Sequence, residues 1–153
     1  MKLSVWVIAI LVTTCIFAGC SKGNKDSPTP TSMTATINGS TFSVSSCLFG
    51  YNNDTLVIAG GNVNPQIHNA IQLLDPYIAL YISNYVVGSP GTFTIGSTAS
   101  VYIDSNRASG YSITGSTGTI TITKSTTTNI TGTFNFTCTD GTVVNGMFTA
   151  NRN

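Results

Sequence analysis

The sequence predicts an all-β protein with one domain, either an antiparallel β-sandwich or a closed β-barrel built of meandering hairpins. Residues that favour strands (Thr, Ile, Val, Phe and Tyr) dominate the chain beyond residue 33, and apolar residues there alternate with polar ones. Turn pairs such as Asn38-Gly39 and Pro90-Gly91 separate these alternating segments. The roughly 120 residues of this region are enough for one hydrophobic core and too few for two. No segment has the pattern of a helix.

The first expected element is a hairpin. Residues 33–37 alternate apolar and polar side chains, and Asn38-Gly39 supplies the positive φ angles that a two-residue turn needs. Such a turn sets Ala35 opposite Phe42, so that the apolar side chains of both strands share one face.

Further strands follow along the chain. Asp75-Pro76 and Pro90-Gly91 are expected to be turns, because a proline cannot continue a central strand. Residues 105–110 are expected to form a loop. The expected strands between these breaks are residues 55–59, 70–74, 77–87, 92–95 and 100–103.

The last third of the domain contains a fourteen-residue quasi-repeat. Each copy places a glycine at or near the start of a strand and apolar residues at alternate positions after it. Because such a repeat is long enough for one strand and one turn, it indicates a β-meander. The copies begin at Gly118, Gly132 and Gly146, and a fourth copy begins upstream at Gly91.

The turn at Asp140-Gly141 determines the register of the last hairpin. A two-residue loop would scatter the apolar side chains over both faces. A three-residue loop with a bulge sets Phe134 opposite Phe148 and Cys138 opposite Val144, on one face. We therefore expect the three-residue loop.

The N-terminus has the pattern of a bacterial lipoprotein signal peptide, comprising residues 1–19. Its apolar stretch of about 15 residues is too short to span a bilayer core, which needs roughly 20. The stretch closes with Phe17-Ala18-Gly19-Cys20. A small-small-Cys box directs lipidation of the cysteine thiol and cleavage just before it, so Cys20 is the expected lipid attachment site. A transmembrane anchor and cleavage at another position are the alternatives.

Residues 20–32 are expected to form a lipidated, disordered tether. They offer too little apolar surface to offset the entropy of ordering. Ser21 differs from the aspartate that marks inner-membrane retention in many Gram-negative bacteria, which predicts an outer-membrane lipoprotein, periplasmic or surface-exposed. The all-β domain then covers residues 33–153.

Charged residues make up only 7% of the chain. The mature protein would be formally neutral, and a neutral domain lacks the electrostatic footprint of nucleic-acid binding. The positive charges of Lys22, Lys25, Arg107, Lys124 and Arg152 cancel the negative charges of Asp26, Asp54, Asp75, Asp104 and Asp140.

Several strand-and-turn segments occur together in this chain: residues 34–39 (TATING), 118–124 (GTITITK), 131–137 (TGTFNFT) and 144–148 (VNGMF). With them the chain resembles a family of small β-rich lipoproteins that is typical of Bacteroidota and classed as a domain of unknown function. The resemblance covers most of the chain beyond the tether. It implies an outer-membrane lipoprotein of β architecture and brings no catalytic residues.

No catalytic, metal or cofactor site is predicted. His68 is the only histidine, and no Gly-x-Ser-x-Gly motif accompanies the many serines. The chain has no glutamate, so a two-carboxylate glycosidase site would depend on aspartates in the tether or beside turns. Two domain thiols and one histidine are too few to hold zinc. An enzyme is therefore not expected.

Cys47 and Cys138 are the two cysteines of the domain, in a compartment where disulfides persist. Cys138 shares the apolar face of Phe136, and a bulge at Ser45-Ser46 would turn Cys47 inward as well. A Cys47–Cys138 disulfide is the expectation, and two separate buried thiols are the alternative.

The segment 77–87 carries the strongest indication of binding. Tyr77, Tyr81 and Tyr85 occupy the face opposite its aliphatic residues, and Tyr102 on a neighbouring strand joins that face. Phenol rings on a solvent-facing sheet form a platform that stacks on sugar rings or docks a protein partner. If the strand is covered on both faces, the same tyrosines serve packing instead.

These features predict an outer-membrane lipoprotein, held to the membrane by the lipid on Cys20, that acts as a non-enzymatic binding module for a glycan or a protein partner. One alternative is a β-barrel carrier of a small apolar ligand, which needs a central cavity. The other is a hydrolase, which needs His68 beside an aspartate and a serine in a cleft.

Overall fold

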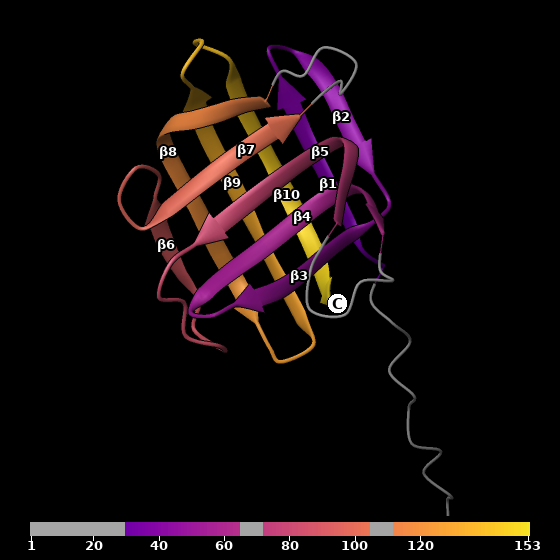
Figure 1. The fold of residues 1–153 in the computed structure, drawn as a ribbon, viewed down its shortest axis with the longest axis vertical. Helices are drawn as coiled ribbons and strands as arrows, with labels where there is room; N and C mark the ends of the chain where they lie inside the picture. Colours follow the sequence, from indigo (N-terminus) through magenta and orange to yellow (C-terminus); the bar gives the residue numbers. More distant parts are fainter. Residues whose placement is uncertain (1–29, 65–71, 105–111) are drawn as a thin grey trace, which may run out of the picture.

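The computed structural model describes residues 30–64, 72–104 and 112–153, and every regular element in these ranges is a β-strand (Figure 1). The strands are β1 (Ser32–Ile37), β2 (Ser40–Val44), β3 (Cys47–Asn52), β4 (Thr55–Asn64), β5 (Gln72–Ile82), β6 (Gly91–Thr94), β7 (Ala99–Asp104), β8 (Ser112–Ser125), β9 (Asn129–Cys138) and β10 (Val143–Arg152). The all-β prediction is confirmed.

Seven strands close into a barrel in the order β3-β4-β5-β7-β8-β9-β10. Closure depends on a short contact in which β10 pairs with β3, with Asn151 opposite Leu48 and Arg152 opposite Phe49. This contact is parallel, whereas the other pairs of strands in the barrel are antiparallel. Of the two predicted architectures, the closed barrel is therefore the one that forms, and its sheet is mixed.

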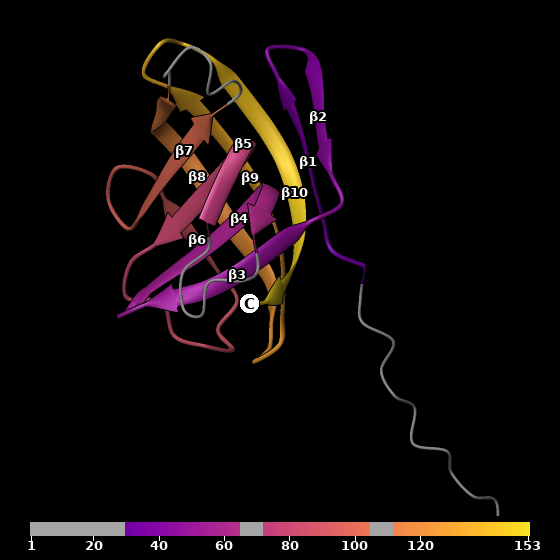
Figure 2. The same cartoon turned by 45° about the vertical axis from the view of Figure 1, so that its right-hand side comes forward.

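The remaining strands lie outside the barrel: β1 pairs with β10, β2 pairs with β1, and β6 pairs with β8. On one edge of β10, the first residues pair with β1 and the last two pair with β3. On one edge of β8, the first residues pair with β7 and later ones pair with β6. The β1–β2 hairpin consequently extends the sheet beyond the barrel wall, at the right of Figure 2.

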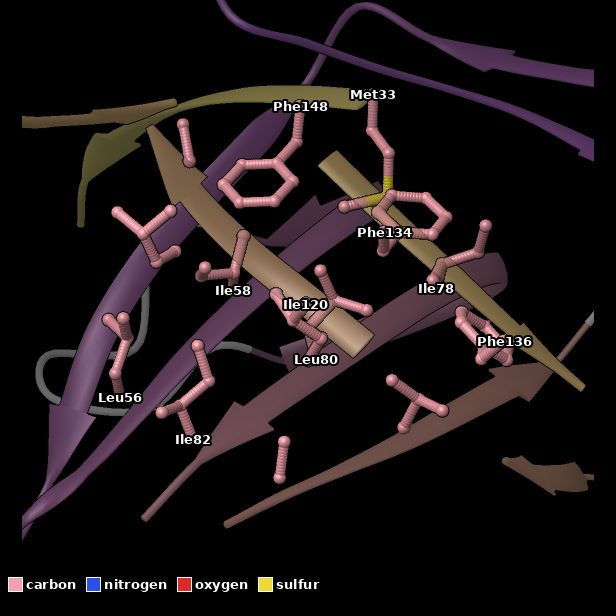
Figure 3. Packing of buried hydrophobic residues seen from close by; sticks show 14 of the residues in the cluster. Met33, Leu56, Ile58, Ile78, Leu80, Ile82, Ile120, Phe134, Phe136 and Phe148 are labelled. Atoms are coloured by element: carbon pink, nitrogen blue, oxygen red, sulfur yellow. The ribbon is translucent and has the colours of Figure 1, made fainter. Parts of the chain in front are cut away.

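The barrel interior is filled by aliphatic and aromatic side chains, as expected for a barrel with so few strands. Phe49, Phe136 and Met33 are among the largest fully buried side chains. Figure 3 shows Phe134, Phe136 and Phe148 facing the aliphatic residues of β4 and β5 across the interior. Rings from β9 and β10 occupy space left by glycines of the repeat: a Cβ added to Gly146 would lie 2.3 Å from Cζ of Phe134.

The predicted first hairpin is confirmed. Asn38 and Gly39 have φ angles of 45° and 83°, as a two-residue turn of this type requires. Ala35 lies opposite Phe42, as predicted. The strand that follows was not predicted: β3 begins at Cys47. Cys47 does point into the core, as the expected bulge at Ser45-Ser46 would make it do, and so does Phe49.

The predicted register of the β9–β10 hairpin is wrong by two residues, and Phe134 lies opposite Gly146. The reason is that the turn lies earlier in the chain than predicted: the backbone N–H of Cys138 donates to the carbonyl of Thr142 at 2.8 Å. The Asp140 carboxylate holds this turn, because it accepts hydrogen bonds from the backbone N–H of Thr142 at 2.9 Å and from its hydroxyl at 3.0 Å. A shift of two residues preserves the predicted faces, because side chains alternate with period two.

The strand predicted at residues 77–87 also differs in its limits. β5 begins at Gln72, continues through Asp75-Pro76 and ends at Ile82. A register shift between Gly61 and Asn62 on β4 accommodates the irregular part of β5. The chain reverses after β5, where Asn84 has a φ of 54°.

Candidate functional site

Two tyrosines form a pair on the outer surface of the barrel. Tyr81 on β5 and Tyr102 on β7 alternate with core residues, so they point outward. Their ring centroids are 5.4 Å apart and the rings are almost perpendicular, at 88°. Tyr102 is 39% exposed. We call this region, together with Tyr77 on the same face of β5, the tyrosine face.

Small residues lie between and beside the tyrosines of this face. Ala79 lies opposite Ala59 on one side and Tyr102 on the other, and both alanines are buried although they point outward. Burial raises the pKa of Tyr81, and the neighbouring phenols of Tyr77 and Tyr102 raise it further. The Tyr81 hydroxyl is therefore neutral at physiological pH.

Tyr85 does not belong to this face, which corrects the prediction. It follows the end of β5, is only 7% exposed and packs against Phe93 with ring centroids 5.7 Å apart. Its backbone N–H donates to the carbonyl of Asp54 at 3.1 Å. The predicted alternation fails here because the strand ends three residues earlier. The hydroxyls of Tyr85 and Tyr51 are buried without a hydrogen-bond partner among the described residues.

The predicted Cys47–Cys138 disulfide is not formed, and both cysteines are buried free thiols. Cys47 begins β3, next to the contact of Leu48 with Asn151, and Asn151 pairs with the first residue of β9. Cys138 is the last residue of β9, on the order of 25 Å away at about 3.3 Å per residue. A disulfide requires Cα atoms about 4.4–6.8 Å apart. Burial raises the pKa of Cys47 to about 12.

A groove of about 510 Å³ lies on a different part of the outer surface, over β8, β9, β10 and the β1–β2 hairpin. Its volume falls in the range of small-molecule sites. We call it the threonine groove. Its lining residues are Thr34, Ala35, Thr36, Thr41, Thr119, Thr121, Thr133, Phe134, Asn135, Asn145, Gly146 and Met147. The set contains hydroxyl and amide side chains and lacks any charged one.

The sequence carries a signal for the threonine groove in the polar positions of the quasi-repeat. The strands were predicted from the apolar positions of the repeat, whose side chains fill the core. The polar positions alternate with them, and in the barrel they place Thr119, Thr133 and Asn135 on the outer face. Register between distant strands brings Thr34 and Thr36 of β1 to the same surface.

A metal site and a membrane-spanning helix are both absent from the described residues. These residues contain no group of three or more His, Cys, Asp or Glu side chains that could hold a metal ion. No helix long and apolar enough to cross a bilayer occurs in this part of the chain. Cys20 and His68 lie outside the described residues.

Comparison with known proteins identified no related protein. No family model, no curated protein and no solved structure matches the chain. The assignment of function therefore depends on the residues and the geometry of this chain.

Proposed function

We propose that this protein is a lipid-anchored outer-membrane lipoprotein whose barrel is a non-enzymatic binding module, and that the tyrosine face contacts a sugar ring of its ligand. The anchor is supported by the small-small-Cys box that ends at Cys20 and by the polar segment between it and β1. The binding role is supported by the outer surface of β5 and β7.

The observation that carries the binding role is the arrangement of Tyr81 and Tyr102. An exposed ring held edge-to-face by its neighbour presents a fixed apolar surface with a polar hydroxyl at its rim. The alanines beside it have no exposed surface, so Tyr102 supplies the accessible apolar area of this pair of strands. The C–H face of a pyranose ring matches this combination of a flat apolar surface and a hydroxyl.

The two alternative functions find less support. A carrier of an apolar ligand needs a hollow interior, whereas large side chains such as Phe49, Phe136 and Leu80 are fully buried inside this barrel. A hydrolase would depend on His68, which lies outside the described residues. Asp140, an exposed aspartate, is occupied by hydrogen bonds to Thr142 within its own turn.

The anchor is tested by Cys20→Ala in the full chain. Metabolic labelling with a fatty acid should be lost, and the protein should leave the membrane fraction or persist as an uncleaved precursor. Normal acyl labelling of the variant would contradict the lipoprotein assignment.

The tyrosine face is tested on a glycan array with the wild-type protein, Tyr102→Ala and Tyr102→Phe. Wild-type protein should bind, Tyr102→Ala should lose most binding, and Tyr102→Phe should retain it because the ring remains. Val86→Ala is the matched control, since Val86 is also apolar and is 67% exposed on a loop. Equal binding by Tyr102→Ala and wild type would exclude the tyrosine face as the site.

A further inference from the structure

We propose that the threonine groove is a second binding site, separate from the tyrosine face, and that it accepts an extended chain of uncharged sugars. Figure 1 shows β5 and β7 in front of the barrel axis and β8, β9 and β10 behind it, so the two surfaces face away from each other. The inference therefore goes beyond the proposed role of the tyrosine face.

The groove is built on a regular array of polar side chains. Backbone register aligns its residues in two rows that run across the strands. Neighbouring members of a row are about 4.8 Å apart and the two rows are about 6.7 Å apart, from the geometry of a sheet. One row is Thr121, Thr133, Met147 and Thr34, and the other is Thr119, Asn135, Asn145, Thr36 and Thr41.

The polar groups in the groove are available to a ligand. Within the described ranges, Thr121 is the one groove residue whose side chain has a hydrogen-bond partner. That partner is the hydroxyl of Thr92, at 3.1 Å. Other threonines of the surface differ, since Thr123 bonds to Thr131. The groove therefore concentrates hydroxyls and amides that still have donor and acceptor capacity, and a hydroxyl can act as either.

The charge pattern selects an uncharged ligand. None of the side chains lining the groove is ionisable. The nearest basic residue along β8, Lys124, lies opposite Thr131, which is outside the lining. A ligand that carries carboxylates or phosphates would give up hydration without meeting a cation, at a free-energy cost that hydroxyl donors alone do not offset.

Met147 supplies the apolar component that sugar binding requires. It sits in the first row between Thr133 and Thr34, and it is 61% exposed. A thioether side chain is flexible and polarisable, so it can follow the C–H face of a pyranose ring. A mixture of one apolar surface with several hydroxyls and amides matches the surface of a neutral glycan.

The shape of the array favours a chain over a single sugar. Both rows cross β8, β9, β10 and β1, and the second also reaches β2, so they extend over the barrel wall and onto the hairpin that projects from it (Figure 2). A ligand aligned with the second row meets a new polar side chain at every strand, and one aligned with the first row meets Met147 on β10 and threonines on the other strands. Several weak contacts of this kind add up only when successive sugars are linked.

The test is isothermal titration calorimetry with the full lipid-bearing protein in a detergent that has no sugar head group. The probes are cellohexaose, laminarihexaose and xylohexaose, with hexagalacturonate as a charged chain of equal length. At least one neutral hexaose should bind, and hexagalacturonate should bind at least about tenfold more weakly. The variant Thr119→Val/Thr133→Val should weaken neutral binding by about tenfold, since it removes two hydrogen-bonding hydroxyls.

The matched control is Thr117→Val/Thr137→Val. These two threonines lie opposite each other on the same strands, outside the groove, and their replacement should leave binding unchanged. Absence of binding to all three neutral hexaoses overturns the inference, and so does equal weakening by the control. Binding that is lost in Tyr102→Ala and retained in Thr119→Val/Thr133→Val overturns the groove while leaving the tyrosine face as the site.

Discussion

Met33 of β1 lies directly against Gly60 of β4, across the gap where β10 parts from β3. A Cβ placed on Gly60 would lie 2.5 Å from Cβ and 2.6 Å from Sδ of Met33. Met33 is fully buried. Because the contact of β3 with β10 involves only two residue pairs, this methionine seals the part of the barrel that backbone pairing leaves open.

Gly60→Ala should therefore destabilise the barrel. The nearest atom is a Cβ, which cannot rotate away, so β1 must shift to make room, at a cost of about 1–3 kcal/mol. Denaturant unfolding monitored by circular dichroism measures this change. Gly91→Ala is the matched control, because its Cβ would meet only Cζ and Cε2 of Phe93, at 3.5 and 3.7 Å. A similar loss of unfolding free energy in both variants would contradict this role of Met33.

Stability should fall in alkali because of Cys47. Its pKa is about 12 in the folded protein, well above its ordinary value, since burial disfavours the thiolate. Above about pH 9 the unfolded chain loses the thiol proton and the folded protein keeps it, so stability decreases by about 1.4 kcal/mol per pH unit up to about pH 12. The difference in unfolding free energy between wild type and Cys47→Ala, measured from pH 8 to 11, isolates this effect from other groups that titrate there. A difference that does not change with pH would refute it.

Both thiols should also behave as free, protected groups. Iodoacetamide should modify neither Cys47 nor Cys138 in the native protein at pH 8, because both are buried. After unfolding without reductant, both should be labelled, and mass spectrometry should show two added groups. Unfolded protein that is labelled only after a reductant is added would instead contain a disulfide.

Tyr81 and Tyr102 should be energetically coupled. An edge-to-face aromatic pair contributes about 0.5–1.5 kcal/mol beyond area burial, so the double variant Tyr81→Ala/Tyr102→Ala should cost less than the sum of the single ones by that amount. Each single variant should cost less than Leu80→Ala, which empties a fully buried position at about 2–5 kcal/mol. Val143→Ala paired with Tyr81→Ala should be additive, since Val143 is exposed on β10. Costs comparable to Leu80→Ala for both tyrosines would mean that the face is covered.

The β9–β10 turn should weaken in acid. Hydrogen bonds from Thr142 lower the pKa of the Asp140 carboxyl, so its contribution is present above the ordinary pKa of an aspartate and is lost as the pH falls through the folded value. The stability difference between wild type and Asp140→Asn should therefore shrink below about pH 4. An unchanged difference between pH 7 and pH 3 would show that the charge of Asp140 does not hold the turn.

Local patterns predicted much of this fold, and long-range contacts were the part that they missed. Alternation placed residues such as Ala35, Phe134 and Phe136 on the inner face, and the Asn38-Gly39 pair correctly predicted the register of the β1–β2 hairpin. The choice of a closed barrel over a sandwich could not be made from the sequence, because the contact that closes the barrel is parallel, involves two residue pairs (Leu48 with Asn151 and Phe49 with Arg152) and leaves no periodic pattern.

The candidate site was predicted in part for the same reason. Tyr81 and Tyr102 were placed together correctly by alternation on adjacent strands, whereas Tyr85 was misplaced because the strand ends before it. The threonine groove joins Thr36 with Thr119, whose strands are separated by two others in the sheet. Such a surface can be predicted only when the register of four strand pairs is known.

The position of β1 determines how the barrel would bear a pulling force. The chain enters the described fold at its N-terminal end through β1, which is paired with β10 on one side and with β2 on the other. Tension transmitted from a membrane anchor would enter the described fold at Ser32, the first residue of β1, and would load the pairing of β1 with β10 and β2. Met33, inserted between β10 and β4, would have to leave the core before β1 could slide. The strand nearest the proposed anchor would therefore be held in place both by backbone pairing and by the packing of Met33 in the core.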